Sequence, residues 1–71
     1  MEYPTAKIYQ REGQLVEEGV GGQPVRVYDA VGRMIDWNTE SEDRRTFTVP
    51  TSGVYLVRVG NAPARRVVVI R

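Results

Sequence analysis

The chain has 71 residues and a mass of 8.0 kDa, which leaves room for one thin core and none for a deep catalytic cleft. It contains no Cys and no His, so disulfides, thiolate nucleophiles, zinc sites and the most common general base near neutral pH are excluded. The net charge is +1, from basic and acidic residues scattered along the chain, which argues against nucleic acid as a partner. We therefore expect a non-catalytic domain without a cofactor, stabilised by sheet packing.

Segments rich in β-branched and aromatic residues recur at intervals of about 8–12 residues, separated by Gly- and Pro-containing breakers. In order, the segments that we predict as strands are residues 5–10, 14–18, 24–29, 33–37, 44–49, 54–59 and 67–70. No segment has a helical period over a useful length. This spacing predicts an all-β sandwich or barrel of roughly seven strands, with the last two forming an antiparallel hairpin at the chain terminus.

The segments between these strands have the composition of turns and loops. Residues 11–13 predict a turn, residues 19–24 a flexible loop that crosses to the next strand pair, and residues 38–43 an exposed polar loop. No apolar run reaches membrane-spanning length, and the residues before the first predicted strand do not have the pattern expected of a signal peptide. Because Met1 is followed directly by polar sequence, we expect residues 1–71 to be one domain cut from a longer protein.

Two predicted turns have specific backbone chemistry. Asp29 and Gly32 occupy the first and fourth positions of a β-turn, where the Asp side chain accepts hydrogen bonds from the turn backbone and Gly takes a conformation that other residues resist. Pro50 and Gly53 bracket the second turn, in which Pro fixes φ early and we expect Gly to take the left-handed conformation. Both turns precede predicted strands.

The positions of the carboxylates along the chain do not indicate a metal site or a catalytic pair. Their spacing matches no calcium-binding loop, so we interpret Asp29 as a turn residue and the others as solvated loop charges. These others are Asp36, Glu40, Glu42 and Asp43. The glycines of residues 19–22 precede no helix, so they do not predict a phosphate-binding loop.

Three aromatic residues have two interpretations. Tyr28, Tyr55 and Trp37 could form a platform that stacks on sugars or bases, but in so small a domain they are more often core residues and cross-strand partners. Trp37 stands beside the polar loop, where an exposed ring would indicate contact with a partner. Likewise, the arginines around the last strand are either solubilising charges or the electrostatic part of a docking strand. These are Arg65, Arg66 and Arg71.

The last predicted strand is apolar on both faces. Val67 and Val69 alternate with Val68 and Ile70, so each face should be covered. One face belongs to the core of the domain, and the other is available to a partner or an upstream domain.

Three blocks of sequence resemble the C-terminal sorting domains of the type IX secretion system of Bacteroidetes. These are VRVYDAVGRMI at residues 25–35, VPTSGVYLVRVG at residues 49–60 and RRVVVIR at residues 65–71. The upstream segment QREGQLVEEGVGGQ looks like the looser first hairpin and Gly-rich crossover of the same domains. The resemblance covers most of the chain, in the order, spacing and terminal position of the family.

The resemblance implies an immunoglobulin-like β-sandwich that ends a cargo protein and acts as a secretion and sorting signal. The cargo enters the periplasm, the outer-membrane translocon and its shuttle or attachment components recognise the folded domain, and the cargo reaches the outer membrane or cell surface. A sortase-like protease usually removes the domain and joins the cargo to an anionic lipopolysaccharide. Whether this domain is cleaved or retained stays open, because the sequence ahead of Thr5 is too short to judge.

The resemblance also marks residues. We expect the partner to bind the terminal hairpin, at Gly53, Val54, Tyr55, Arg65, Arg66, Val67, Val68, Val69, Ile70 and Arg71. The residues that we expect to shape the adjoining turns are Asp29, Gly32, Arg33 and Pro50.

The chain departs from the family pattern at two places. Two residues separate Pro50 from Gly53 where the family commonly has one, and the terminus has Arg where Lys is usual, which changes the hydrogen-bonding geometry. An alternative function is an immunoglobulin-like accessory module that binds a glycan or a neighbouring protein.

Overall fold

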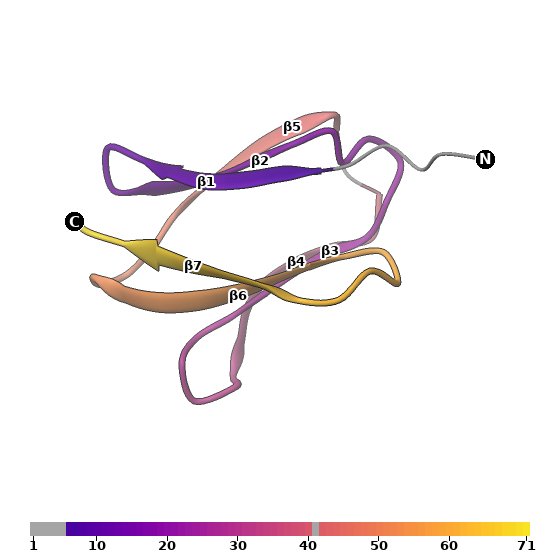
Figure 1. The fold of residues 1–71 in the computed structure, drawn as a ribbon. Coiled ribbons are helices and arrows are strands. Elements are labelled where there is room, and N and C mark those ends of the chain that lie inside the picture. The colour runs from indigo at the N-terminus through magenta and orange to yellow at the C-terminus, as the bar shows by residue number, and fades with distance from the viewer. Residues whose placement is uncertain (1–5, 41) are drawn as a thin grey trace.

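The structure is a computed structural model that describes residues 6–40 and 42–71, and every regular element in these ranges is a β-strand. The strands are β1 (Lys7–Arg11), β2 (Gln14–Glu18), β3 (Val25–Tyr28), β4 (Met34–Asn38), β5 (Arg44–Thr48), β6 (Gly53–Val59) and β7 (Arg65–Val69). They form two antiparallel sheets, which we call sheet A (β1-β2-β5) and sheet B (β4-β3-β6-β7), packed as the two layers in Figure 1. The predicted all-β fold of seven strands is confirmed for the part of the chain described.

The predicted strand limits differ from the observed ones by one or two residues at most ends. Asn38, predicted to open a loop, is the last residue of β4, while β7 begins at Arg65 and ends before Ile70. Thr5, predicted to begin the first strand, lies outside the described residues, as does Ser41. The residues that the structure describes include no helix long and apolar enough to cross a membrane.

The core lies between the sheets and is made mainly of β-branched side chains. In β3, Val25 and Val27 are fully buried and alternate with Arg26 and Tyr28, which face outward, because successive side chains in a strand point to opposite faces. The buried cluster comprises Ala6, Leu15, Val20, Val25, Val27, Val49, Tyr55, Val57, Val59, Val67 and Val69. The packing of the two sheets therefore stabilises this domain, which has no disulfides.

A tight turn joins β1 to β2. Glu12 and Gly13 both have positive φ, 51° and 76°, as in the type I′ turn that matches the twist of an antiparallel hairpin. Glycine accepts this conformation freely, whereas Glu12 takes it at a steric cost. The predicted turn is therefore present, with Arg11 belonging to the strand before it.

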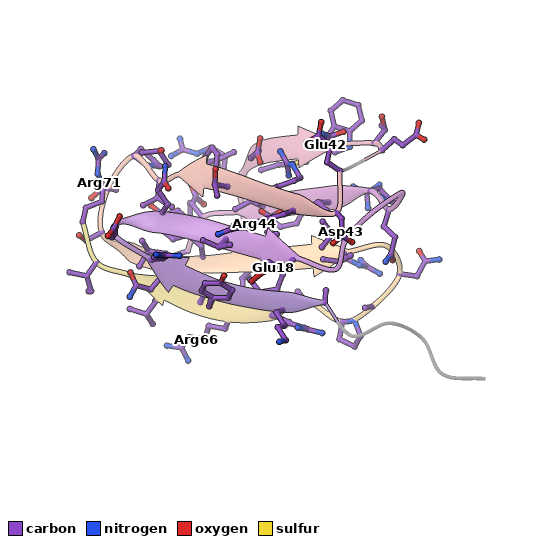
Figure 2. All side chains as sticks on the ribbon, turned by 90° about the horizontal axis from the view of Figure 1, so that it is seen from above. Glu18, Glu42, Asp43, Arg44, Arg66 and Arg71 are labelled. Atoms are coloured by element: carbon purple, nitrogen blue, oxygen red, sulfur yellow. The ribbon has the colours of Figure 1, made fainter. Side chains whose placement is uncertain are left out.

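The sandwich is closed differently along its two sides. Along one side β1 lies beside β7, as Figure 2 shows from above, and the Arg65 guanidinium donates a hydrogen bond to the carbonyl of Ala6. Along the other side Arg45 of β5 bridges the sheets. Its Nη1 lies 3.2 Å from Glu17 Oε2 in sheet A, and its Nη2 lies 2.9 Å from Asp36 Oδ2 in sheet B.

This ion-pair network corrects one prediction and adds an unpredicted residue. Asp36 was interpreted as a solvated loop charge, although the strand predicted at residues 33–37 includes it. It lies in β4, and its carboxylate pairs with Arg45. Glu17 is fully buried, and its Oε1 has no hydrogen-bond partner in the structure. Burial raises the pKa of the Glu17 carboxyl above its ordinary value of 4.5, and the nearby Arg45 charge opposes this shift.

Candidate functional site at the terminal hairpin

The terminal hairpin β6–β7 presents one face to the core and one to solvent. Tyr55 pairs with Val67, and Val54 pairs with Val68, in antiparallel register. Val67 and Val69 pack into the core, whereas Val68 is 51% exposed and Ile70, just beyond the strand, is 66% exposed. Of the two apolar faces that the sequence predicts, the one with Val68 and Ile70 is therefore open to a partner.

Tyr55 anchors the start of β6. Its ring is buried in the core with 2% of the residue exposed, and its hydroxyl donates a 2.5 Å hydrogen bond to the carbonyl of Thr51. A buried tyrosine that satisfies its hydroxyl in this way fixes the backbone upstream of it. Tyr55 is therefore no part of an exposed aromatic platform.

The last residue of the chain is held by the loop between β5 and β6. The backbone N–H of Arg71 donates to Ser52 Oγ at 2.7 Å, and its guanidinium Nη1 donates to the carbonyls of Val49 at 3.0 Å and Pro50 at 3.2 Å. Figure 2 shows Arg71 at the end of the sandwich opposite to Glu42. Sequence reasoning did not single out Ser52, because its partner is 19 residues away in the chain.

The turn between β3 and β4 is built around Asp29. The N–H of Gly32 donates to the Asp29 carbonyl at 3.0 Å, and Gly32 has a positive φ of 86°. Asp29 Oδ1 accepts from the N–H groups of Val31 at 3.1 Å and Arg33 at 2.9 Å, and Oδ2 accepts from Arg33 Nε at 2.9 Å. These bonds, chiefly the one from the Arg33 backbone, lower the pKa of the Asp29 carboxyl below 3.8. The carboxylate is thus occupied by its own turn.

Gly53 corrects a second prediction. It was expected to take the left-handed conformation, but it is the first residue of β6, pairs with Val69 and is not among the described glycines with positive φ. A Cβ built on Gly53 would meet no atom within 4 Å. Neither the backbone nor close packing therefore demands glycine at this position.

The two turns marked by the resemblance meet in space. They line one shallow surface hollow. The loops that contain them lie at the same end of the sandwich as the chain terminus (Figure 1). The lining residues are Asp29, Ala30, Val31, Arg33, Thr51, Ser52, Gly53, Val54 and Tyr55. The Arg33 side chain at its rim is 77% exposed. The hollow thus joins predicted site residues from two distant stretches of sequence.

The remaining predicted site residues have separate surroundings. Arg65 is half-buried and bonded to the Ala6 carbonyl, which gives it a structural contact. Arg66 is exposed on the outer side of β7, as Figure 2 shows. Trp37 is 55% exposed, and Tyr28 is half-buried on the same sheet. Among residues 6–40 and 42–71, no group of three acidic side chains lies close enough to hold a metal ion.

Comparisons with protein-family models, with curated proteins and with solved structures gave no match to this chain.

Proposed function

We propose that this domain is a non-catalytic secretion and sorting signal of the type IX secretion system. It directs an attached protein from the periplasm through the outer-membrane translocon to the cell surface. The proposal rests on the three blocks of resemblance, together with where those blocks lie in the fold.

The observation that carries the proposal is that the three blocks form a single sheet. Residues 25–35 supply β3 and the start of β4, residues 49–60 contain β6, and residues 65–71 contain β7. These four strands are the whole of sheet B, whereas the looser upstream resemblance falls in β1 and β2 of sheet A. Segments that are separated in the sequence thus form one contiguous sheet. This is expected if a receptor recognises the folded domain and not a linear peptide.

Two further features support an immunoglobulin-like topology. The strands divide into a three-stranded and a four-stranded antiparallel sheet, and the sixth strand has a buried tyrosine near its start. The Tyr55 hydroxyl bonds to the backbone carbonyl four residues upstream, as in the tyrosine corner of immunoglobulin-like domains.

The recognition element of the proposed signal is the end of the sandwich that contains the chain terminus. Val68 and Ile70 offer exposed apolar surface, and Arg33 offers an exposed cation at the rim of the hollow. The hydrogen bonds of Arg71 to the loop between β5 and β6 hold the terminus in a defined position. A pre-ordered terminus binds a receptor with a smaller entropic cost than a flexible tail.

The test is delivery of the cargo after changes at the terminus. Removing residues 67–71 should leave the cargo in the periplasm, and normal surface delivery of this truncated protein would refute the proposal. Because truncation removes core residues, a second variant carries Val68→Thr and Ile70→Thr, which alters only exposed side chains. This variant should keep the melting temperature of the wild type and reduce delivery, while Arg11→Ala on sheet A should change neither.

A second candidate function is an accessory module that binds a glycan or a neighbouring protein. The exposed ring of Trp37 favours it, because solvent-exposed tryptophans are enriched where proteins bind partners. Tyr55 cannot contribute, and Tyr28 is half-buried. If the terminal variants leave delivery intact while a Trp37→Ala variant loses a surface function of the cargo, this candidate replaces the first.

A further inference from the structure

The two outer faces of the sandwich differ in chemistry. The outer face of sheet B consists of the side chains that alternate with the buried residues of its strands: Arg26, Tyr28, Met34, Trp37, Val54, Leu56, Arg58, Arg66 and Val68. The matching face of sheet A consists of Lys7, Tyr9, Arg11, Gln14, Val16, Glu18, Arg44, Thr46 and Thr48. All exposed large hydrophobic residues in the described ranges lie on sheet B or on the segments joined to its strands.

The composition of the outer face of sheet B is that of a protein interface. Interface centres are enriched in Trp, Tyr, Phe, Met and Arg and depleted in Lys, Glu, Asp, Ser and Ala. The face contains four of the five enriched types and none of the five depleted ones. Trp37 and Met34, at 55% and 49% exposure, are large apolar side chains that an isolated domain leaves in water.

One row of this face places three residues side by side across three strands. Trp37 of β4 is the register partner of Arg26 of β3, and Arg26 is the register partner of Arg58 of β6. We call these three residues the Trp37 row. Since neighbouring strands lie about 4.8 Å apart, the row extends over roughly 10 Å across the sheet.

The two arginines of the row form a like-charge pair that nothing in the described part of the chain neutralises. Like charges directly opposite each other in a sheet are destabilising. The salt bridges of the described residues involve other arginines, and the outer face of sheet B has no carboxylate on its strands. Places where a local arrangement opposes folding are expected to be functional or strained sites, so this pair singles out the face as a candidate binding surface.

We infer that the Trp37 row docks an acidic segment of a partner protein. The guanidinium groups of Arg26 and Arg58 bind its carboxylates in bidentate geometry, and an apolar side chain of the partner packs on Trp37. The row lies on the same sheet as the terminal residues of the sorting proposal but consists of other residues, so it does not depend on the sorting function. It specifies a partner for the accessory-module candidate, on which it rests. Charge complementarity selects the partner, because the face is cationic and has no acidic residue of its own.

The apolar residues beside the row favour an acidic protein segment as the ligand over a nucleic acid or an acidic polysaccharide. Leu56 and Met34 lie in the adjacent row, on either side of Tyr28, where a nucleic acid or an acidic polysaccharide would gain little from them. A second copy of the chain does not fit face to face, because two such surfaces would bring like charges together.

The test is a selection of displayed random peptides on the immobilised domain. Wild type should enrich peptides that combine Asp or Glu with Leu, Phe or Trp, and a variant with Arg26→Glu and Arg58→Glu should not enrich them. Trp37 is the only tryptophan, so its emission reports directly whether an enriched peptide binds at the row. Failure to enrich acidic peptides, or enrichment of the same peptides by both proteins, overturns the inference.

Single variants separate binding from folding. Arg26→Glu turns the like-charge pair into an opposite-charge pair, so its melting temperature should rise while the affinity for a fluorescein-labelled selected peptide falls about tenfold or more. Trp37→Ala should weaken binding by about thirtyfold, as expected of an interface hot spot. Arg11→Glu on sheet A is the matched control and should change neither affinity nor selection.

Competing occupants are tested in the same assay. Polygalacturonate and a single-stranded oligonucleotide should shift Trp37 emission only at far higher concentration than the selected peptides. If either binds more tightly than the peptides, the row is a polyanion site and the inference is wrong. Sedimentation equilibrium should find a monomer, and a dimer that shields Trp37 would overturn the inference in favour of a second copy.

Discussion

Replacing Arg45 by Met should destabilise the domain more than most substitutions of a charged residue. The change keeps an unbranched side chain at this position but leaves the Glu17 carboxylate fully buried without its cation. Removing one partner of a buried ion pair costs about 3–5 kcal/mol. Since a chain of 71 residues has a total stability of about 4–10 kcal/mol, Arg45→Met should bring the domain close to unfolding at pH 7.

The pH dependence identifies Glu17 as the origin of the loss. Its pKa is raised in the folded protein, so the folded state binds more protons than the unfolded state between 4.5 and the folded-state pKa. Stability should therefore increase as the pH falls from 7 toward 4.5, and the gain should be larger in Arg45→Met than in wild type. Urea unfolding followed by circular dichroism at pH 7 and pH 5 measures this difference.

A double variant completes the test. Glu17→Leu with Arg45→Met removes both buried charges and should recover most of the lost stability, because an apolar pair replaces a buried ion pair at little or no cost. If Arg45→Met loses less than about 1 kcal/mol, the pair behaves as a surface salt bridge, contrary to the burial seen here. A double variant as unstable as Arg45→Met would also contradict the reasoning.

Two substitutions and one titration test the turns. Glu12→Asn should stabilise the domain by up to about 1 kcal/mol in thermal unfolding, because Asn tolerates the left-handed conformation at a type I′ turn; a loss would contradict the assigned backbone. Tyr55→Phe should lose about 1 kcal/mol with the fold intact, through the missing bond to Thr51, and an unchanged melting temperature would argue against that bond. The Asp29 carboxyl should titrate below 3.8 by NMR, so that its contribution to stability is present above that pH and lost in stronger acid; a midpoint at 3.8 or higher would exclude the turn bonds.

Local chemistry explains why the strands could be predicted from the sequence. Val25 and Val27 alternate with outward residues, and Asp29 and Gly32 carry the bonds and the backbone conformation of their turn, so neighbours along the chain determine these elements. The division of strands between sheets depends on non-local pairing. Nothing in the composition of β4 says that it pairs with β3 in the four-stranded sheet while β5 joins β2 in the other.

The misplaced residues all depend on distant partners. Asp36 borders a polar run and reads as a loop charge, but Arg45 reaches it from the other sheet. Glu17 was not singled out from the sequence, because its partner Arg45 lies on the neighbouring strand β5, 28 residues later in the chain. Gly53 was expected to turn the chain, yet the preceding residues make the turn and Gly53 pairs with Val69.

The residues of the candidate site were marked from the sequence, but their arrangement in space could not be. The resemblance marks Arg33 and Gly53, but only the packing of sheet B shows that they border one hollow. The exposure of Trp37 likewise follows from its register with Arg26, which faces outward because its neighbours in β3 are buried.

Fusing residues 1–71 to a reporter protein tests directly whether they act as a secretion signal. A reporter protein with a periplasmic export signal is fused to the amino-terminal side of the domain and expressed in a Bacteroidetes strain that has the type IX machinery. We predict that the fused reporter reaches the cell surface or the medium, while the reporter alone stays in the periplasm. A folded fusion that remains in the periplasm, in cells that export their own type IX cargo, would contradict the proposed function.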